Sequence, residues 1–171
     1  DLTEASEAEI SEYLAGYDES QLIGIANNVK GIVHELLWID AYNEANTSTQ
    51  AELFGETNHP GADVRIYDTQ AGETVTELQL KATNSVSYIE EHQLRYTEIE
   101  VVATNEVAAD MDYVTASGYN NDELIDLTSD TIGNLTDNSV EDRVLESSAL
   151  AATAATGQEL LAMLQGRKEF P

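Results

Sequence analysis

A long apolar stripe near the N-terminus constrains the fold of this chain more than any other feature. Between Gln21 and about Asn46 the large apolar residues recur at intervals of three and four, the spacing of one face of an α-helix. The stripe consists of Leu22, Ile25, Val29, Ile32, Val33, Leu36 and Leu37. It stops at the helix-breaking Asn-Thr-Ser-Thr run. We therefore predict a principal core helix over this segment, against which the rest of the domain packs.

Three segments with strand character follow this helix, at residues 50–55, 62–68 and 74–83. The second and third are separated by the turn Thr-Gln-Ala-Gly-Glu, which predicts a β-hairpin. Residues 86–96 then predict a helix, and the short apolar run at 99–103 predicts a strand in the interior of a sheet. The predicted order is helix, three strands, helix, strand.

The signals are weaker on either side of this core. The acidic residues 1–20 predict a short amphipathic helix ending near Gly16, residues 113–117 predict a further strand, and two late segments, 121–135 and 140–165, predict helices. A chain of 171 residues is long enough for one domain with a proper core. We expect three parts: an N-terminal helical segment at 1–20, an α/β core at 21–118 and a helical C-terminal extension at 119–171.

The charge of the chain is strongly negative. Seven basic against 33 acidic residues give a formal net charge of −26, with the acids spread along a sequence that is 42% hydrophobic. This distribution indicates an acidic surface on a folded domain rather than a disordered tail. Such a composition resembles that of proteins from extreme halophiles, where molar salt screens charges over about 3 Å. We expect a cytoplasmic protein of a halophilic archaeon or bacterium; an acidic decoy or cation buffer is less favoured because the acids do not cluster.

Several classes of chemistry are excluded by residue content and motifs. The chain contains no cysteine, so disulfides and thiolate chemistry are absent, and no apolar run approaches the ~20 residues that cross a bilayer. There is no P-loop, nucleophile elbow, dinucleotide fingerprint or zinc-protease motif. Because the chain begins at Asp1 rather than Met, we expect that it was excised from a longer one, which leaves open a signal or anchor at either end.

Polar side chains follow one face of the predicted hairpin. Strand alternation places Asp63 on the polar face of the second strand, and Glu77, Gln79 and Lys81 on the polar face of the third. If the apolar faces coincide, these side chains converge. Carboxylate and amide oxygens suit Mg²⁺, which keeps several waters and needs only one or two protein carboxylates. A nearby lysine can position a water for attack on a phosphodiester.

With Asp63 at the start of the second strand and Gln79-Leu80-Lys81 on the third, the chain resembles the PD-(D/E)XK nuclease superfamily, the fold of many restriction enzymes, junction resolvases and repair nucleases. The core order of that superfamily, helix, three-stranded meander, helix, strand, matches residues 21–104. Glutamine in place of the commoner acid is similar to Mrr-like restriction endonucleases. The resemblance implies an α/β fold with a restriction-endonuclease-like core.

The same resemblance implies a function. It implies a nuclease that hydrolyses DNA with Mg²⁺ or Mn²⁺, the metal being held by Asp63, Gln79 and Glu77 while Lys81 acts on the attacking water. Members often add an acid from the first helix, and Glu35 is the candidate here. Many relatives are dimers, so a homodimer or a place in a larger polypeptide is also expected.

Plainer interpretations stand beside these roles. Lys81 is also explained as an edge-strand lysine, Glu77 and Gln79 as the wet face of an antiparallel sheet, and Glu35 as a surface acid. His59 is more simply a surface residue than a metal ligand. The remaining aromatic residues that we considered are assigned to packing (Trp38, Tyr42) or given no role (His34, His92).

Two other functions remain open at this point. A protein of charge −26 has few basic residues with which to hold a polyanion. That difficulty favours, as an alternative, a non-catalytic restriction-endonuclease-like interaction domain of a larger halophilic protein. A third hypothesis is an unrelated α+β binding module whose polar strand face is simply hydrated.

Overall fold

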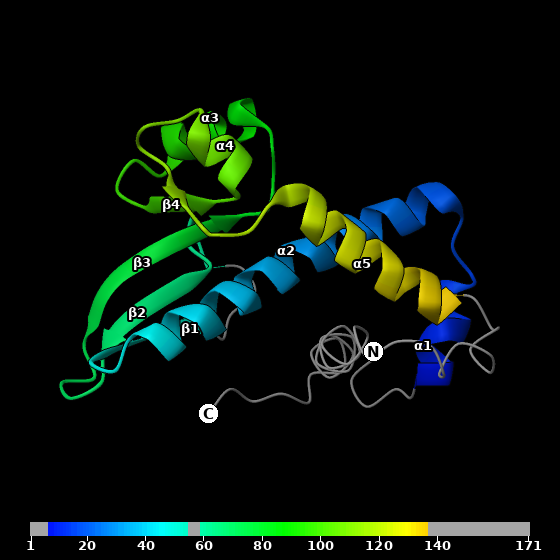
Figure 1. Ribbon diagram of the computed structural model, residues 1–171, viewed down its shortest axis with the longest axis horizontal. Coiled ribbons are helices and arrows are strands. Elements are labelled where there is room, and N and C mark those ends of the chain that lie inside the picture. The colour runs from blue at the N-terminus through cyan, green and yellow to red at the C-terminus, as the bar shows by residue number, and fades with distance from the viewer. Residues whose placement is uncertain (1–6, 55–58, 137–171) are drawn as a thin grey trace. The chain divides into compact units, whose positions relative to one another are not determined.

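The computed structural model describes residues 7–54 and 59–136, shown in Figure 1. The chain is mixed α/β, with five strands in one sheet. The helices are α1 (Glu7–Leu14), α2 (Glu19–Ala45), α3 (Val86–Arg95), α4 (Asn105–Ala109) and α5 (Asn121–Thr136). The strands are β1 (Thr49–Leu53), β2 (Val64–Asp68), β3 (Thr74–Lys81), β4 (Glu100–Ala103) and β5 (Thr115–Ala116).

Most of the predicted elements are confirmed within a few residues. The core helix, the three strands, the following helix and the apolar strand all occur in the predicted order. The late strand is reduced to Thr115–Ala116, and the short helix α4 was not predicted because five residues carry too little periodicity. The helix predicted over residues 140–165 lies outside the described residues.

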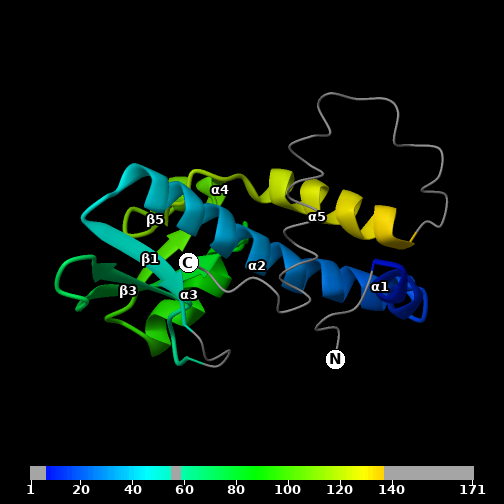
Figure 2. The same ribbon diagram turned by 90° about the horizontal axis from the view of Figure 1, so that it is seen from below.

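Contacts within the chain divide it into two compact units. One is Lys30–Leu124, which contains the whole sheet; the other consists of the residues before and after that range. In the second unit α1, the start of α2 and most of α5 carry buried apolar residues, among them Ile10, Val29 and Ile132. Within this unit the start of α2 and the length of α5 lie side by side in Figures 1 and 2. The candidate site lies entirely in the unit Lys30–Leu124.

The sheet has the strand order β1-β2-β3-β4-β5 and mixed strand directions. The first three strands pair antiparallel as a meander, with a short turn joining β2 to β3, whereas β4 and β5 run parallel to β3. A parallel neighbour needs a crossover connection, and α3 supplies it between β3 and β4. As a result β3 is a central strand, flanked by β2 and β4.

Each face of the sheet packs against helices. On one face Val64, Leu78 and Leu80 pack with Ile39 of α2, flanked by the partly buried Trp38 and Tyr42. On the other, Val101 and Ala103 of β4 pack with Ile89 of α3, together with Val107, Met111 and Val114. The prediction that Trp38 and Tyr42 pack on the core is confirmed, and their rings stack with centroids 5.1 Å apart.

The outer edge of β1 is covered by a side chain. Asn43 of α2 donates to the Ala51 carbonyl at 3.0 Å and accepts from the Ala51 amide at 2.7 Å, as a neighbouring strand would. Tyr42 Oη and Thr49 Oγ1, 2.9 Å apart, add a bond alongside. These bonds satisfy the backbone amide and carbonyl of Ala51, which on an open edge could pair with a strand of another chain.

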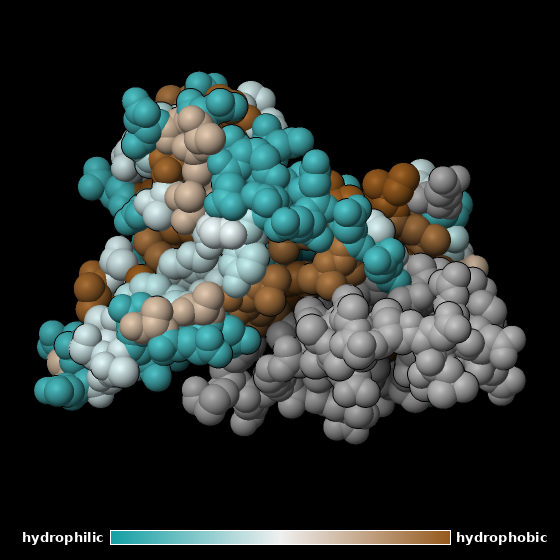
Figure 3. Space-filling view, in the orientation of Figure 1, coloured by the Kyte–Doolittle hydropathy of each residue, from teal (hydrophilic) through white to brown (hydrophobic). Residues whose placement is uncertain are grey.

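None of the helices within residues 7–54 and 59–136 is both long and apolar enough to cross a membrane. In Figure 3 hydrophilic residues form a broad area over the upper part of the view and a second area at the lower left, with hydrophobic residues between them.

Candidate functional site

Asp63 lies at the entrance to β2 and is fixed there by its own backbone. Its amide donates to the Leu78 carbonyl at 2.9 Å, and its carbonyl accepts from Phe54 at 3.2 Å. Because Val64 pairs with Leu78 in the antiparallel register, Asp63 falls opposite Gln79. The hairpin therefore brings the two residues of the predicted motif face to face.

The side chains of Asp63 and Gln79 are in direct contact. The Gln79 amide donates to Asp63 Oδ2 and, at 3.1 Å, to the Leu80 carbonyl, while the Leu80 amide donates to the same carboxylate oxygen at 3.2 Å. Gln79 is only 4% exposed, so it does not belong to a hydrated sheet face. We call Asp63 and Gln79 the acid–amide pair.

Glu35 on α2 is a partly buried acid within reach of the charge of Asp63. Its pKa is raised to about 8, first by burial and then by the negative charge of Asp63, against the positive charge of Lys81. The side chain of Glu35 is therefore partly buried rather than exposed on the surface, and it is within electrostatic reach of both Asp63 and Lys81.

The carboxyl group of Asp63 is also perturbed. Burial raises its pKa above the usual range for aspartate, while the charge of Lys81 and the Leu80 amide lower it. Two desolvated acids thus share one positively charged neighbour. Such an arrangement costs folding free energy unless a further cation compensates it.

Lys81 ends β3, a central strand, so it is not an edge-strand lysine. Its Nζ lies 5.2 Å from the centroid of the Tyr88 ring on α3. Within residues 7–54 and 59–136 no carboxylate forms an ion pair with it. The ammonium group is held by an aromatic face rather than by an acid, which leaves it able to approach a ligand.

Glu77 lies one residue pair further along the hairpin. It pairs with Arg65, which in turn pairs with Glu52 and forms a salt bridge with it. We call Glu52, Arg65 and Glu77 the Arg65 row. Glu77 is therefore opposite Arg65 rather than opposite Asp63. The acid whose pKa responds to the charge of Asp63 is Glu35.

The described residues contain no group of three or more His, Asp or Glu side chains placed to hold a metal ion. The oxygen donors that lie together are the Asp63 carboxylate, the Gln79 amide and the Leu80 carbonyl, and the charge of Asp63 acts on Glu35 nearby. This set resembles the sparse protein ligation of Mg²⁺ rather than a closed cage.

The remaining histidines have distinct surroundings. His59 stacks on Phe54, with ring centroids 3.7 Å apart. His34 on α2 is fully buried against the edge of Tyr119, and burial together with the charge of Lys30 lowers its pKa to about 4. Neither imidazole is in contact with the acid–amide pair.

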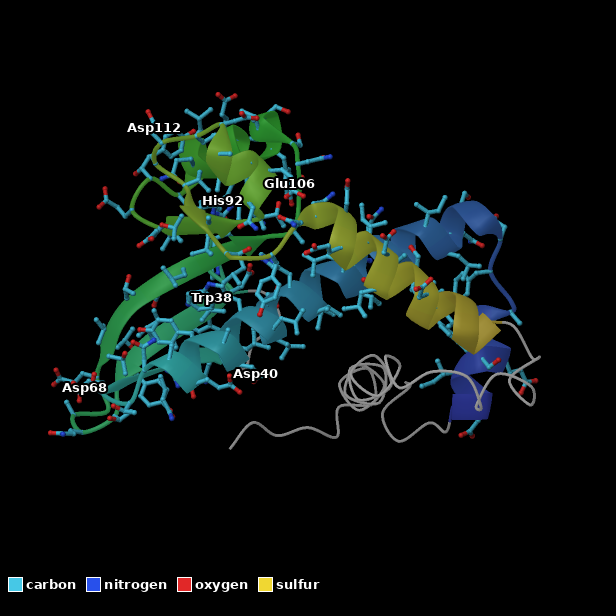
Figure 4. The ribbon with its side chains drawn as sticks, in the orientation of Figure 1. Trp38, Asp40, Asp68, His92, Glu106 and Asp112 are labelled. Carbon is cyan, nitrogen blue, oxygen red and sulfur yellow. The ribbon has the colours of Figure 1, made fainter. Side chains whose placement is uncertain are left out.

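Sequence reasoning missed the part of the site that α3 supplies. Tyr88 and His92 share one face of that helix, and Tyr96 follows at its C-terminal cap at the same four-residue interval. The Tyr88 ring lies under Lys81, and the ring of Tyr96 packs on Gly61, two residues before Asp63. In Figure 4 His92 lies between α3 and the sheet. The four-residue recurrence of rings was the available signal.

No protein-family model, curated protein or solved structure matches this chain.

Proposed function

We propose that this chain is a metal-dependent nuclease that hydrolyses phosphodiester bonds in DNA. The observation that carries the proposal is the contact between Asp63 and Gln79, with the charge of Lys81 acting on both Asp63 and Glu35. These residues come from three separate elements, and groups with perturbed pKa values that converge in this way are typical of functional sites. The element order α2, β1-β2-β3, α3, β4 further supports a restriction-endonuclease-like core and membership of the PD-(D/E)XK superfamily.

The donor set fits a magnesium or manganese ion. Asp63 and Glu35 are acids whose pKa values burial has raised, so a divalent cation near them would offset the cost of their charge. The amide of Gln79 now donates from its nitrogen, and half a turn of the carboxamide would present its oxygen instead. Asp63, Gln79 and the Leu80 carbonyl would hold the ion, with Glu35 behind them; Glu77, beside Arg65, is the weakest of the predicted ligands. When bound, the ion would supply electrostatic stabilisation of charge on the phosphate.

The protein's own contribution is positioning. Lys81, whose charge acts on both acids, would orient the attacking water and stabilise the negative charge that develops on the phosphate. In the reaction a bond forms between the water oxygen and phosphorus, and the bond from phosphorus to the leaving sugar oxygen breaks. The water gives up a proton and the leaving oxygen takes one up, so the exchange is balanced.

Cleavage of DNA in molar KCl with Mg²⁺ tests the proposal, because high salt screens a chain of charge −26 from a polyanion. Wild type is compared with Asp63→Ala and Lys81→Ala, and with Glu91→Gln as a control at an exposed position of α3. We expect cleavage by wild type and the control, and loss in the two site variants. Equal trace cleavage in all four proteins would show contamination and remove the catalytic assignment.

Stability supplies a readout that does not depend on activity. Mg²⁺ that binds only the folded state raises the free energy of unfolding, by about 2.7 kcal/mol at a hundred times its dissociation constant. We expect this increase in wild type at pH 8 and not in Asp63→Asn. An equal increase in both proteins would indicate non-specific binding to the acidic surface.

A non-catalytic interaction domain is the second candidate. It is favoured by one feature of the site: the Gln79 amide already satisfies the Asp63 carboxylate within the protein. The charge of −26 also disfavours a DNA substrate. In that case neither Mg²⁺-dependent cleavage nor site-specific stabilisation by Mg²⁺ would be observed.

A further inference from the structure

Of the lysine and arginine side chains that the structure describes, only Lys81 is available to a phosphate group. Within residues 7–54 and 59–136 these side chains are Lys30, Arg65, Lys81 and Arg95. Both arginines form ion pairs with glutamates. Lys30 is buried and donates to the side-chain oxygen of Asn121 at 2.8 Å. Lys81 is only partly buried, and it forms no ion pair within the same residues.

One lysine is a weak means of holding DNA. Contacts between cationic side chains and phosphates gain their affinity from released counterions, and this affinity falls steeply as salt is raised. A chain of net charge −26 also repels a polyanion, and the molar salt that screens this repulsion screens the attraction of Lys81 as well. A DNA substrate is therefore held through contacts that do not depend on charge. Stacking of a base on an aromatic ring is a contact of this kind.

Tyr88 offers an aromatic ring directly beside Lys81. The Lys81 Nζ lies 5.2 Å from the centroid of the Tyr88 ring. Tyr88 is nevertheless 51% exposed, so a flat partner can still reach the ring. A ring has two faces, and a cation over one of them leaves the other for a base. Because the ring and the ammonium group are neighbours, a base on Tyr88 brings the phosphate next to it towards Lys81.

The backbone on which Tyr88 and Lys81 stand is anchored. Ser85 caps the start of α3, where its Oγ accepts from the Tyr88 amide at 3.4 Å. The next residue, Ile89, is fully buried and packs with the residues of β4. At the end of β3 the Lys81 carbonyl accepts from the Thr104 amide at 3.2 Å. The ring and the lysine are therefore held in place before a ligand arrives, which lowers the entropy cost of binding.

A second aromatic group lies next to Asp63. The Phe54 amide donates to the Asp63 carbonyl at 3.2 Å, and the rings of Phe54 and His59 stack with centroids 3.7 Å apart. Both of these residues are only partly buried. Asp63 and Lys81, the two residues that would act on the phosphate, thus each have an aromatic residue nearby. Aromatic side chains along a path for the DNA backbone are typical of proteins that bind single strands.

We propose that Tyr88 stacks on an unpaired base beside the scissile phosphate, and that the substrate of this site is DNA with unpaired bases, such as a single strand, a flap or a frayed end. The face of a base is accessible only where the strand is unpaired, because in a duplex each base lies between its neighbours. The ring holds the base while Lys81 reaches the phosphate. The inference rests on the proposed nuclease function and adds to it the form of the substrate.

Binding of fluorescent oligonucleotides in molar KCl, with Ca²⁺ as the divalent cation, tests the stacking apart from cleavage. We expect wild type to bind a single strand more tightly than a blunt duplex of the same sequence. Tyr88→Leu removes the ring and should weaken binding of the single strand about 5–150-fold, whereas Tyr88→Phe keeps the ring and should stay within a few-fold of wild type. Tyr113→Leu is the matched control, because Tyr113 is 56% exposed and lies in the turn before β5.

An oligonucleotide made of abasic residues separates stacking from an effect of Tyr88 through Lys81, since it keeps the phosphates and lacks the bases. We expect Tyr88→Leu to leave the affinity for this oligonucleotide nearly unchanged. An equal loss on the normal and the abasic strand would show that the ring acts only by placing Lys81, and would overturn the proposal. No measurable binding of the single strand, or the same affinity in wild type and Tyr88→Leu, would overturn it as well.

Cleavage with Mg²⁺ distinguishes a failure of this inference from a failure of the nuclease function. We expect wild type to cut the single strand faster than the blunt duplex, and Tyr88→Leu to lose this preference. Equal rates on both substrates, unchanged in Tyr88→Leu, would overturn the stacking and leave the nuclease function intact. If wild type binds single strands through Tyr88 but cleaves none, the nuclease function fails and the stacking stands.

Discussion

Two groups of charged residues lie next to each other on the same hairpin and have opposite characters. In the Arg65 row the arginine side chain is 45% exposed and is bonded to Glu52. One residue pair nearer the strand end, Gln79 is buried and Asp63 is partly buried, and burial raises the pKa values of Asp63 and Glu35. Neighbouring positions of the same hairpin thus hold a partly exposed ion pair and an aspartate whose pKa is raised.

The difference lies in what covers each group. The Arg65 row faces solvent, where paired charges cost little and contribute little. The charge of Asp63 reaches Glu35 on α2, and Lys81, which lies over Tyr88 of α3, acts on both acids. Groups with pKa values perturbed in this way are typical of functional sites.

The largest expected effect separates Gln79 from Glu77, which are two residues apart on the same face of β3. Gln79→Ala removes the side chain that touches Asp63, and we expect cleavage of DNA to fall about a thousandfold, as when a group that stabilises transition-state charge is lost. Glu77→Ala leaves that contact intact, and we expect a change of a few-fold at most. Initial rates in molar KCl with Mg²⁺ measure both. Equal losses of cleavage rate in the two variants would place Glu77 in the site together with Gln79.

The next effect concerns stability as a function of pH in the absence of divalent cations. The pKa of Glu35 is about 8 in the folded state and near 4.5 in the unfolded chain, so the folded state binds the extra proton between these values. The free energy of unfolding therefore falls as pH rises through this window, by about 2–4 kcal/mol in total.

Denaturation in molar KCl at pH 5, 6, 7 and 8 measures this fall in wild type, in Glu35→Gln and in Glu77→Gln. The neutral amide of Glu35→Gln removes most of the pH dependence, whereas Glu77→Gln retains it. A wild-type slope that persists in Glu35→Gln would assign the proton uptake to another acid, with Asp63 the first to examine.

The smallest effect is expected in the Arg65 row. A double-mutant cycle with Arg65→Gln and Glu52→Gln should give a coupling of about 0.2–1 kcal/mol, because the pair is largely solvated. The coupling should weaken further as KCl is raised, since salt screens exposed charges. A coupling free energy of several kcal/mol would mean that water screens the pair of Arg65 and Glu52 much less than its exposure suggests.

Much of the fold was predictable because it depends on local periodicity. The stripe from Leu22 to Leu37 predicted α2, and the alternation around Val64 and Leu78 predicted the hairpin and its buried face. Asp63 opposite Gln79 followed from the same alternation, since the apolar faces of paired strands must coincide. The two-residue strand β5 and the short helix α4 have too few residues for a pattern to form.

The sequence by itself determined the elements, their order and the face of the sheet on which the polar residues lie. Only the tertiary structure decided that Lys81 is central rather than at an edge, that Glu35 is within reach of the charge of Asp63, and that Tyr96 packs on Gly61. The physical reason is that periodicity acts between near neighbours in the chain. The burial and charge that set a pKa come from residues that folding brings together from distant positions.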